Sequence, residues 1–122
     1  MTVEECVQHI INRIKPYHKQ GIEVTGDKTK TIHRLEIGIG VCTDVCEIYE
    51  HGADTCLVSD DDVNNWIGVQ WAMEHDSPLI VINFMICDAP GMEHMAEYLS
   101  NQFTKNTITF VSDDYGFSHI EK

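Results

Sequence analysis

Four consecutive apolar residues at positions 79–82, Leu-Ile-Val-Ile, constrain the fold of this chain more than any other segment. They follow a turn signal, Asp-Ser-Pro at positions 76–78. A strand without polar side chains must be covered on both faces, which is typical of a parallel sheet between two layers of helices. The run therefore predicts a buried strand in an α/β fold.

The rest of the chain alternates between strand and helix patterns, as such a fold requires. Apolar residues alternate with glycine or glutamate over positions 35–41, and positions 55–58 form a short apolar run. Thr2 and Glu5 form a capping box that begins a helix ending before Pro16. Further helices are predicted at 43–51, 65–75 and 90–103, and weaker strands at 22–24 and 108–110. The buried stripe of the 90–103 helix is predicted to comprise Met92, Met95, Ala96, Leu99 and Phe103.

Short connections between these segments call for right-handed crossovers. We therefore expect residues 1–122 to form a single three-layer α/β domain, with a mostly parallel sheet and helices on both faces. The chain does not open with a basic signal sequence, and no apolar run approaches the roughly 20 residues that span a bilayer. We expect a cytoplasmic location without membrane contact. The five cysteines, an odd number at irregular spacing, are interpreted as reduced packing residues.

Charge is distributed very unevenly along the chain. The formal net charge is −12, and six of the eight Lys and Arg residues lie in the first 34 positions. None occurs from Leu35 to Thr104, a stretch that carries thirteen Asp and Glu residues. Such a surface repels phosphates, so nucleic acid is excluded as a partner.

Polar side chains gather where the predicted parallel strands end, which is where ligands bind in sheets of this kind. They are Asp44, Asp60, Asp61, Asp62, Asn64, Asn65, Asn83, Cys87 and Asp88. Their oxygen atoms suit Mg²⁺, Ca²⁺ or Mn²⁺. The competing interpretation is helix capping, because Thr43, Asp62 and Asp88 each precede a predicted helix.

Two other patterns each have a functional and a structural interpretation. Gly38-x-Gly40-x-x-Thr43, with Asp60 at the end of the next strand, is similar to part of a dinucleotide fingerprint but lacks its third glycine. Trp66 and Trp71 are predicted to pack the third helix, in a core or an interface, instead of stacking on a base. The histidines are predicted to lie mostly on helices, away from the strand ends.

Several short pieces in order resemble the C-terminal half of the NIF-three-like proteins. They are Gly-Ala-Asp at 52–54, Leu-Val-Ser-Asp at 57–60, Pro-Leu-Ile at 78–80, Asn83, Pro-Gly-Met at 90–92 and Ala-Glu-Tyr-Leu at 96–99. That family is also called the dinuclear metal centre family, and some members are labelled GTP cyclohydrolase I type two. The resemblance implies two similar α/β halves, a two-metal site between them and assembly into hexameric toroids.

The resemblance also implies which residues correspond to the metal ligands. The family's His-x-x-x-Glu motif before the Pro-Gly helix falls on Phe84 and Asp88, and its His-His-Pro motif is absent. The metal site is therefore expected to be degenerate, with Asp88 and Asp60 as the metal candidates and Asp44, Asp61, Asn64 and Asn83 as further strand-end candidates.

We interpret the chain as a non-catalytic binding or self-association domain of unknown ligand, with no cofactor expected and a divalent cation as the only candidate. Half of a two-lobed protein should expose apolar surface, so a homo-oligomer or a partner protein chain is expected. One alternative is a metal-dependent hydrolase-like enzyme that uses the acidic strand-end loops, alone or completed by another chain. A second alternative is a nucleotide-binding module.

Overall fold

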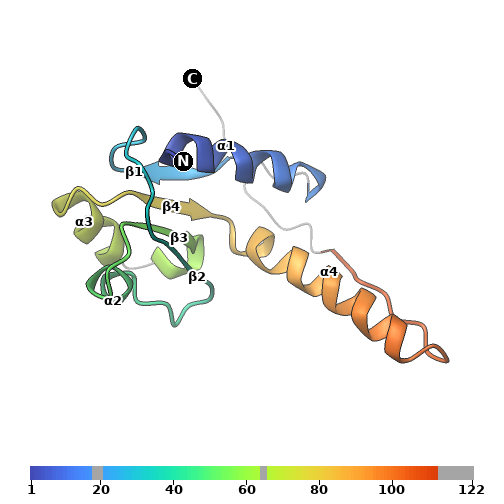
Figure 1. Cartoon of the computed structure of the whole chain (residues 1–122). Coiled ribbons are helices and arrows are strands. Elements are labelled where there is room, and N and C mark those ends of the chain that lie inside the picture. The colour runs from blue at the N-terminus through green and yellow to red at the C-terminus, as the bar shows by residue number, and fades with distance from the viewer. Residues whose placement is uncertain (18–20, 64–65, 113–122) are drawn as a thin grey trace, which may run out of the picture.

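The structure is a computed structural model that describes residues 1–17, 21–63 and 66–112. Helices and strands alternate along the chain (Figure 1). In chain order the elements are α1 (Val3–Ile14), η1 (Lys15–Tyr17), β1 (Glu23–Thr25), β2 (Leu35–Gly38), α2 (Val45–Glu50), β3 (Thr55–Ser59), η2 (Asp60–Val63), α3 (Ile67–Glu74), β4 (Leu79–Ile82) and α4 (Phe84–Gln102).

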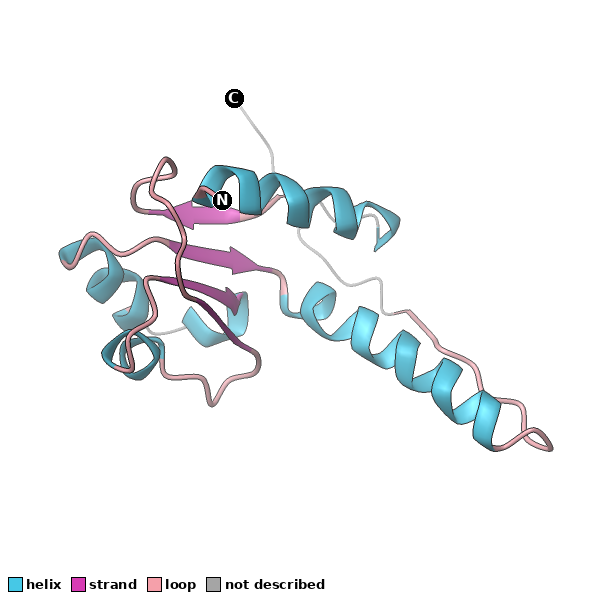
Figure 2. Cartoon of the chain, viewed as in Figure 1, coloured by secondary structure: helices cyan, strands magenta, loops and turns pink. Residues whose placement is uncertain are grey.

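The four strands form one sheet in the order β1-β4-β3-β2 (Figure 2). β2, β3 and β4 are parallel, and β1 joins the far side of β4 in the antiparallel direction. The predicted α/β class with a mostly parallel sheet is confirmed, and the sheet is mixed because of β1. The crossovers through α2 and α3 supply the long connections that parallel neighbours need.

Helices cover both faces of the sheet, as predicted, and β4 lies between the two helical layers. Leu79 and Val81 pack with residues of α2 and α3 in one apolar cluster, whereas Ile80 packs with Val3 and Cys6 of α1 in another. All four side chains of β4 are buried. The alternation of side chains along a strand thus sends successive residues into opposite layers.

The predicted capping box of α1 is present. The Thr2 hydroxyl accepts a hydrogen bond from Glu5 N at 3.2 Å, and Thr2 N donates to Glu5 Oε2 at 2.8 Å. Val3 N also donates to Lys30 O, which joins the start of α1 to the loop before β2. The local sequence signal and the tertiary contact therefore agree at this helix start.

The start of α4 was predicted wrongly. The helix begins at Phe84, so Pro90 lies within it and Asp88 cannot be its N-cap. A side chain from the end of β3 binds the first backbone N–H of the helix, as described below, and this long-range contact replaces a local capping signal. At α2 the cap is Asp44 instead of the predicted Thr43.

Two predicted strands differ from the structure. β2 ends at Gly38 because the chain turns at Gly40, whose φ is +94° and whose carbonyl accepts from Thr43 N at 2.9 Å. Residues 108–110 form no strand, so this prediction is wrong. Alternating apolar residues without a neighbouring strand in reach have nothing to pair with.

The predicted burial of the α4 stripe is also wrong in large part. Met92, Met95 and Phe103 are exposed, and Ile86 is the one buried residue of the helix. Ile86 packs with Ile14 and Ile82 near the sheet, and the remainder of α4 projects beyond it (Figure 1). Within residues 1–17, 21–63 and 66–112, no helix combines the length and apolar character needed to cross a membrane.

We predict that alkaline pH destabilises the fold through Cys56. Burial raises the pKa of this thiol from its ordinary value of 9.0 to about 11. Between these two values the folded state keeps the proton that the unfolded chain has lost, so the free energy of unfolding falls as pH rises from 9 to 11. Urea unfolding at several pH values should show this fall. It should be shallower in Cys56→Ala and unchanged in the control Cys42→Ala, whose side chain is exposed; equal slopes in all three proteins would contradict the assignment.

Candidate functional site

Asp60 and Asn83, which the sequence places at neighbouring strand ends, lie together in the structure. Asp60 directly follows β3, and its Oδ2 accepts from Asn83 Nδ2 at 2.9 Å. Its Oδ1 accepts from Phe84 N, the first N–H of α4, also at 2.9 Å. A carboxylate at a helix N-terminus is stabilised by the unpaired N–H groups and the helix dipole. Asp60 therefore links the end of β3 to the start of α4.

Ser59 makes a second connection at this edge, and sequence reasoning did not include it among the site residues. Its side chain is fully buried at the end of β3. Its Oγ donates to Asp61 Oδ1 and accepts from Gly40 N at 3.3 Å. The only available signal was a hydroxyl residue that ends an apolar strand. Ser59 and Asp61 thus tie the loop after β2 to the start of η2.

The other predicted site residues do not join this pair. Asp44 Oδ1 accepts from Cys46 N and Glu47 N at 2.9 and 3.1 Å, so capping of α2 accounts for its position. Asp88 is exposed on α4, one turn after Phe84. Asn64, together with Asn65, falls outside the described residues.

The side chains at this edge do not fit the two-metal centre that the resemblance implied. Both Asp60 oxygens accept hydrogen bonds from Asn83 and Phe84, and the phenyl ring of Phe84 supplies no donor atom for a metal. Across the part of the chain that the structure describes, no three His, Cys, Asp or Glu side chains are placed to hold one ion. A tetrahedral or octahedral shell needs more ligands than this edge offers.

One buried polar atom at this edge of the sheet can accept a further hydrogen bond. Asn83 Oδ1 is buried and has no hydrogen-bond partner among the described residues. A buried acceptor without a donor costs about 1–3 kcal/mol. The amide is oriented by the bond from its Nδ2 to Asp60, so Oδ1 is the atom left to accept from a donor.

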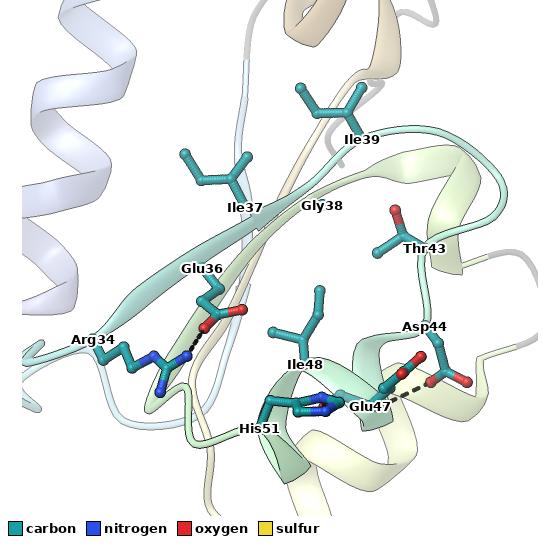
Figure 3. A pocket seen from close by; sticks show the side chains of 10 residues that line it. All are labelled: Arg34, Glu36, Ile37, Gly38, Ile39, Thr43, Asp44, Glu47, Ile48 and His51. Atoms are coloured by element: carbon teal, nitrogen blue, oxygen red, sulfur yellow. Dashed lines mark hydrogen bonds and ion pairs between the residues drawn. The ribbon is translucent and has the colours of Figure 1, made fainter.

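A shallow depression of about 570 Å³ lies between β2 and α2 (Figure 3). Charged and polar side chains that line it include Arg34, Glu36, Thr43, Asp44, Glu47 and His51. Arg34 forms an ion pair with Glu36. The three carboxylates outnumber the two basic groups, so this depression does not favour a phosphate ligand.

In the glycine pattern before α2, the space beside Gly38 is occupied by a side chain of the protein itself. A Cβ at Gly38 would lie 2.2 Å from Thr43 Cγ2, so the absent side chain makes room for Thr43. In a dinucleotide site the corresponding space admits the pyrophosphate. Here Thr43 accounts for Gly38 without a nucleotide.

The two tryptophans differ in their surroundings. Trp71 stacks on Tyr49 with ring centroids 5.0 Å apart and on His75 at 3.8 Å. Its predicted packing role is therefore confirmed. Trp66 is 71% exposed, with a left-handed φ of +59°, so it does not pack in the core of this chain.

Comparison with known proteins gives similarity at the level of the fold. No family model and no curated protein matches the sequence. Two crystal structures of Staphylococcus aureus protein SA1388, one titled a hypothetical protein, are 21% identical and align with TM-scores of 0.67 and 0.68. Each alignment covers 97% of this chain and 34% of SA1388.

A Bacillus cereus protein related to NIF3 is also similar in structure. It aligns with a TM-score of 0.70 and 13% identity over 97% of this chain and 33% of that protein. This chain therefore spans about a third of the length of the solved structures that it matches.

We predict that Asp60 is a structural residue whose loss is measurable in stability. Asp60→Ala removes the acceptor of Phe84 N and of Asn83 Nδ2, and should lower the free energy of unfolding by about 1–2 kcal/mol. The matched control Asp88→Ala removes an exposed carboxylate from the same helix and should cost less than about 0.5 kcal/mol. Urea unfolding monitored by circular dichroism measures both values. A larger loss for Asp88→Ala than for Asp60→Ala would show that the assignment of the helix start is wrong.

Proposed function

From the NIF3-like fold of this chain, we propose that it is a non-catalytic domain that works by self-association. The observation that carries the proposal is the exposed apolar stripe of α4. Met92, Met95 and Phe103 have the helical spacing of a packed face, yet each is more than half exposed. Contact with a further copy of the chain would remove this apolar area from water.

The size of the uncovered surface supports the proposal. Tyr98 adds to the exposed apolar side chains of α4, and Ile37, Ile39 and Val41 are exposed around β2. Large contiguous apolar patches are uncommon on monomeric proteins and mark interaction sites. Exposed apolar side chains at two places in the structure, on α4 and around β2, favour assembly.

The comparison with solved structures is consistent with this proposal. About two thirds of each SA1388 or NIF3-related chain lies outside the aligned region. Those proteins have further residues of their own that can cover an α/β unit of this kind. Contact with another copy can cover the exposed apolar side chains of α4 and β2 in a similar way.

A second candidate function is a metal-dependent hydrolase-like activity completed by another chain. The observation that favours it is the buried Asn83 Oδ1 next to Asp60, an oxygen to which none of the described residues donates a hydrogen bond. Another chain would have to supply most of the ligands. A nucleotide-binding role has less support, because Thr43 fills the space at Gly38.

We predict that the purified chain is a dimer or a larger oligomer at tens of micromolar. Association should bury the apolar stripe of α4 or the apolar surface around β2. Multi-angle light scattering over a dilution series gives the mass, which is 13.9 kDa for one copy. A constant monomer mass over the whole series would contradict self-association.

We also predict that the wild-type protein does not hold a stoichiometric divalent ion, and that Phe84→His with Asp88→Glu creates weak binding of zinc. His and Glu four residues apart on α4 can reach one ion, but two ligands cannot complete its shell. Calorimetric titration measures both proteins, with Phe84→His plus Asp88→Ala as the control that lacks the second ligand. Tight binding by the wild type that Asp88→Ala abolishes would favour the hydrolase-like alternative.

A further inference from the structure

β2 is an edge strand of the sheet that the described residues form. Among the described residues β2 pairs with β3 on one side and with no strand on the other. Arg34 O accepts from Asp54 N, and Gly40 N donates to Ser59 Oγ, so the even-numbered residues direct their backbone groups toward β3. By the two-residue period of a strand, Leu35 and Ile37 direct theirs outward, and Ile39 follows directly after the end of β2.

Of these three residues, Ile37 and Ile39 also have exposed side chains, whereas Leu35 packs against the apolar cluster of Val3, Cys6 and Ile80. Ile37 is 61% and Ile39 is 55% exposed. Both residues border the depression, and their side chains point away from α2 (Figure 3). They lie on the face of the sheet that α1 covers near β4, where Ile80 packs with Val3. α1 does not extend far enough to cover them.

The edge lacks the features that usually prevent strand pairing. Natural edge strands carry lysine, proline or bulges, which block the approach of another strand. Residues 35–41 contain no lysine and no proline, and Glu36 is their single charged residue. Glu36 is paired with Arg34 on the α2 side of the strand. The apolar face at this edge is therefore open to a second strand.

We propose that a second copy of this chain adds its β2 antiparallel to this edge, about a two-fold axis through Ile37. The inference rests on the self-association proposed above and identifies the surface that mediates it. Ile37 faces Ile37 of the other copy, and Leu35 faces Ile39. The two sheets become one continuous sheet of eight strands, from four in each copy.

The strand is complementary to itself in this register. The outward N–H and C=O groups of Ile37 pair across the axis, and those of Leu35 pair with Ile39. The apolar side chains of both copies meet on one face. Glu36 faces Gly38, which has no side chain, so two carboxylates are not placed directly opposite each other.

The strand itself presents little charge to a second copy. Two chains of net charge −12 repel each other. The ion pair between Arg34 and Glu36 neutralises the one carboxylate within residues 35–41. Added salt screens the remaining repulsion. The dimer should therefore strengthen with salt, whereas a basic peptide bound at the same edge would weaken.

Ile37→Lys tests the surface, because lysine on an edge strand blocks pairing. The substitution also makes the net charge less negative, and the reduced repulsion between copies would by itself strengthen the dimer. The matched control is Ile67→Lys, the same change at a residue of α3 that is 64% exposed. Sedimentation equilibrium should show at least a tenfold weaker dimer for Ile37→Lys, an unchanged dimer for Ile67→Lys, and native circular dichroism for both.

Cross-linking tests the register independently of folding stability. Residues in a hydrogen-bonded antiparallel pair have Cα atoms about 5.5 Å apart, within the range of a disulfide. In a Cys42→Ser background, Ile37→Cys should form a covalent dimer on mild oxidation, and Ile67→Cys should not. Equal cross-linking of the two variants would overturn the register.

The outcomes separate this inference from the proposed function. A wild-type dimer that Ile37→Lys leaves intact and Met95→Lys dissociates would overturn the β2 pairing and keep self-association through α4. A monomeric wild type would overturn both. Loss of the dimer in Ile37→Lys alone, together with a wild-type dimer that strengthens with salt, supports the β2 pairing. A wild-type complex that weakens with salt would show that the occupant of the β2 edge is not a second acidic copy.

Discussion

The burial of β4 on both faces is the constraint on which the rest of the fold depends. Leu79 and Val81 need an apolar layer on one side, and Ile80 needs one on the other. β4 lies inside the sheet, with β3 and β1 as neighbours, so its backbone groups are paired on both edges. α1 on one face and α2 with α3 on the other then supply the two layers. A sheet covered in this way loses apolar surface to water on both sides, which is the dominant stabilising contribution.

Hydrogen bonds to backbone N–H groups explain the positions of two carboxylates at the acidic edge of the sheet. Asp60 caps α4 from a different strand, and Asp44 caps α2 from its own N-terminus. Carboxylates that accept backbone N–H groups are stabilised as anions, so a cluster of acids at strand ends does not require a cation. This chain thus has the NIF3-like fold, and polar residues at its strand ends join neighbouring elements of the structure.

The uncovered apolar residues lie at the periphery of the structure. β2 is the edge strand farthest from α1, and most of α4 extends past the sheet (Figure 1). Both segments carry apolar side chains at the spacing of a packed face, and several of these side chains, Ile37, Ile39, Met92, Met95 and Phe103, are exposed. Under the proposed self-association these side chains would be covered, since the same apolar contacts that stabilise an interior also stabilise an interface.

The sequence by itself determined the features that depend on near neighbours. The capping box at Thr2, the apolar run of β4 and the alternation of strands and helices each follow from contacts within a few residues, so the α/β class and most element positions could be predicted. The tertiary structure decided which apolar faces are covered and where α4 begins. Ile37 and Met95 have the same local pattern as Ile80 and Cys6 but lie outside the helical layers. The helix start at Phe84 depends on Asp60, a residue 24 positions earlier that only the parallel pairing of β3 and β4 brings near.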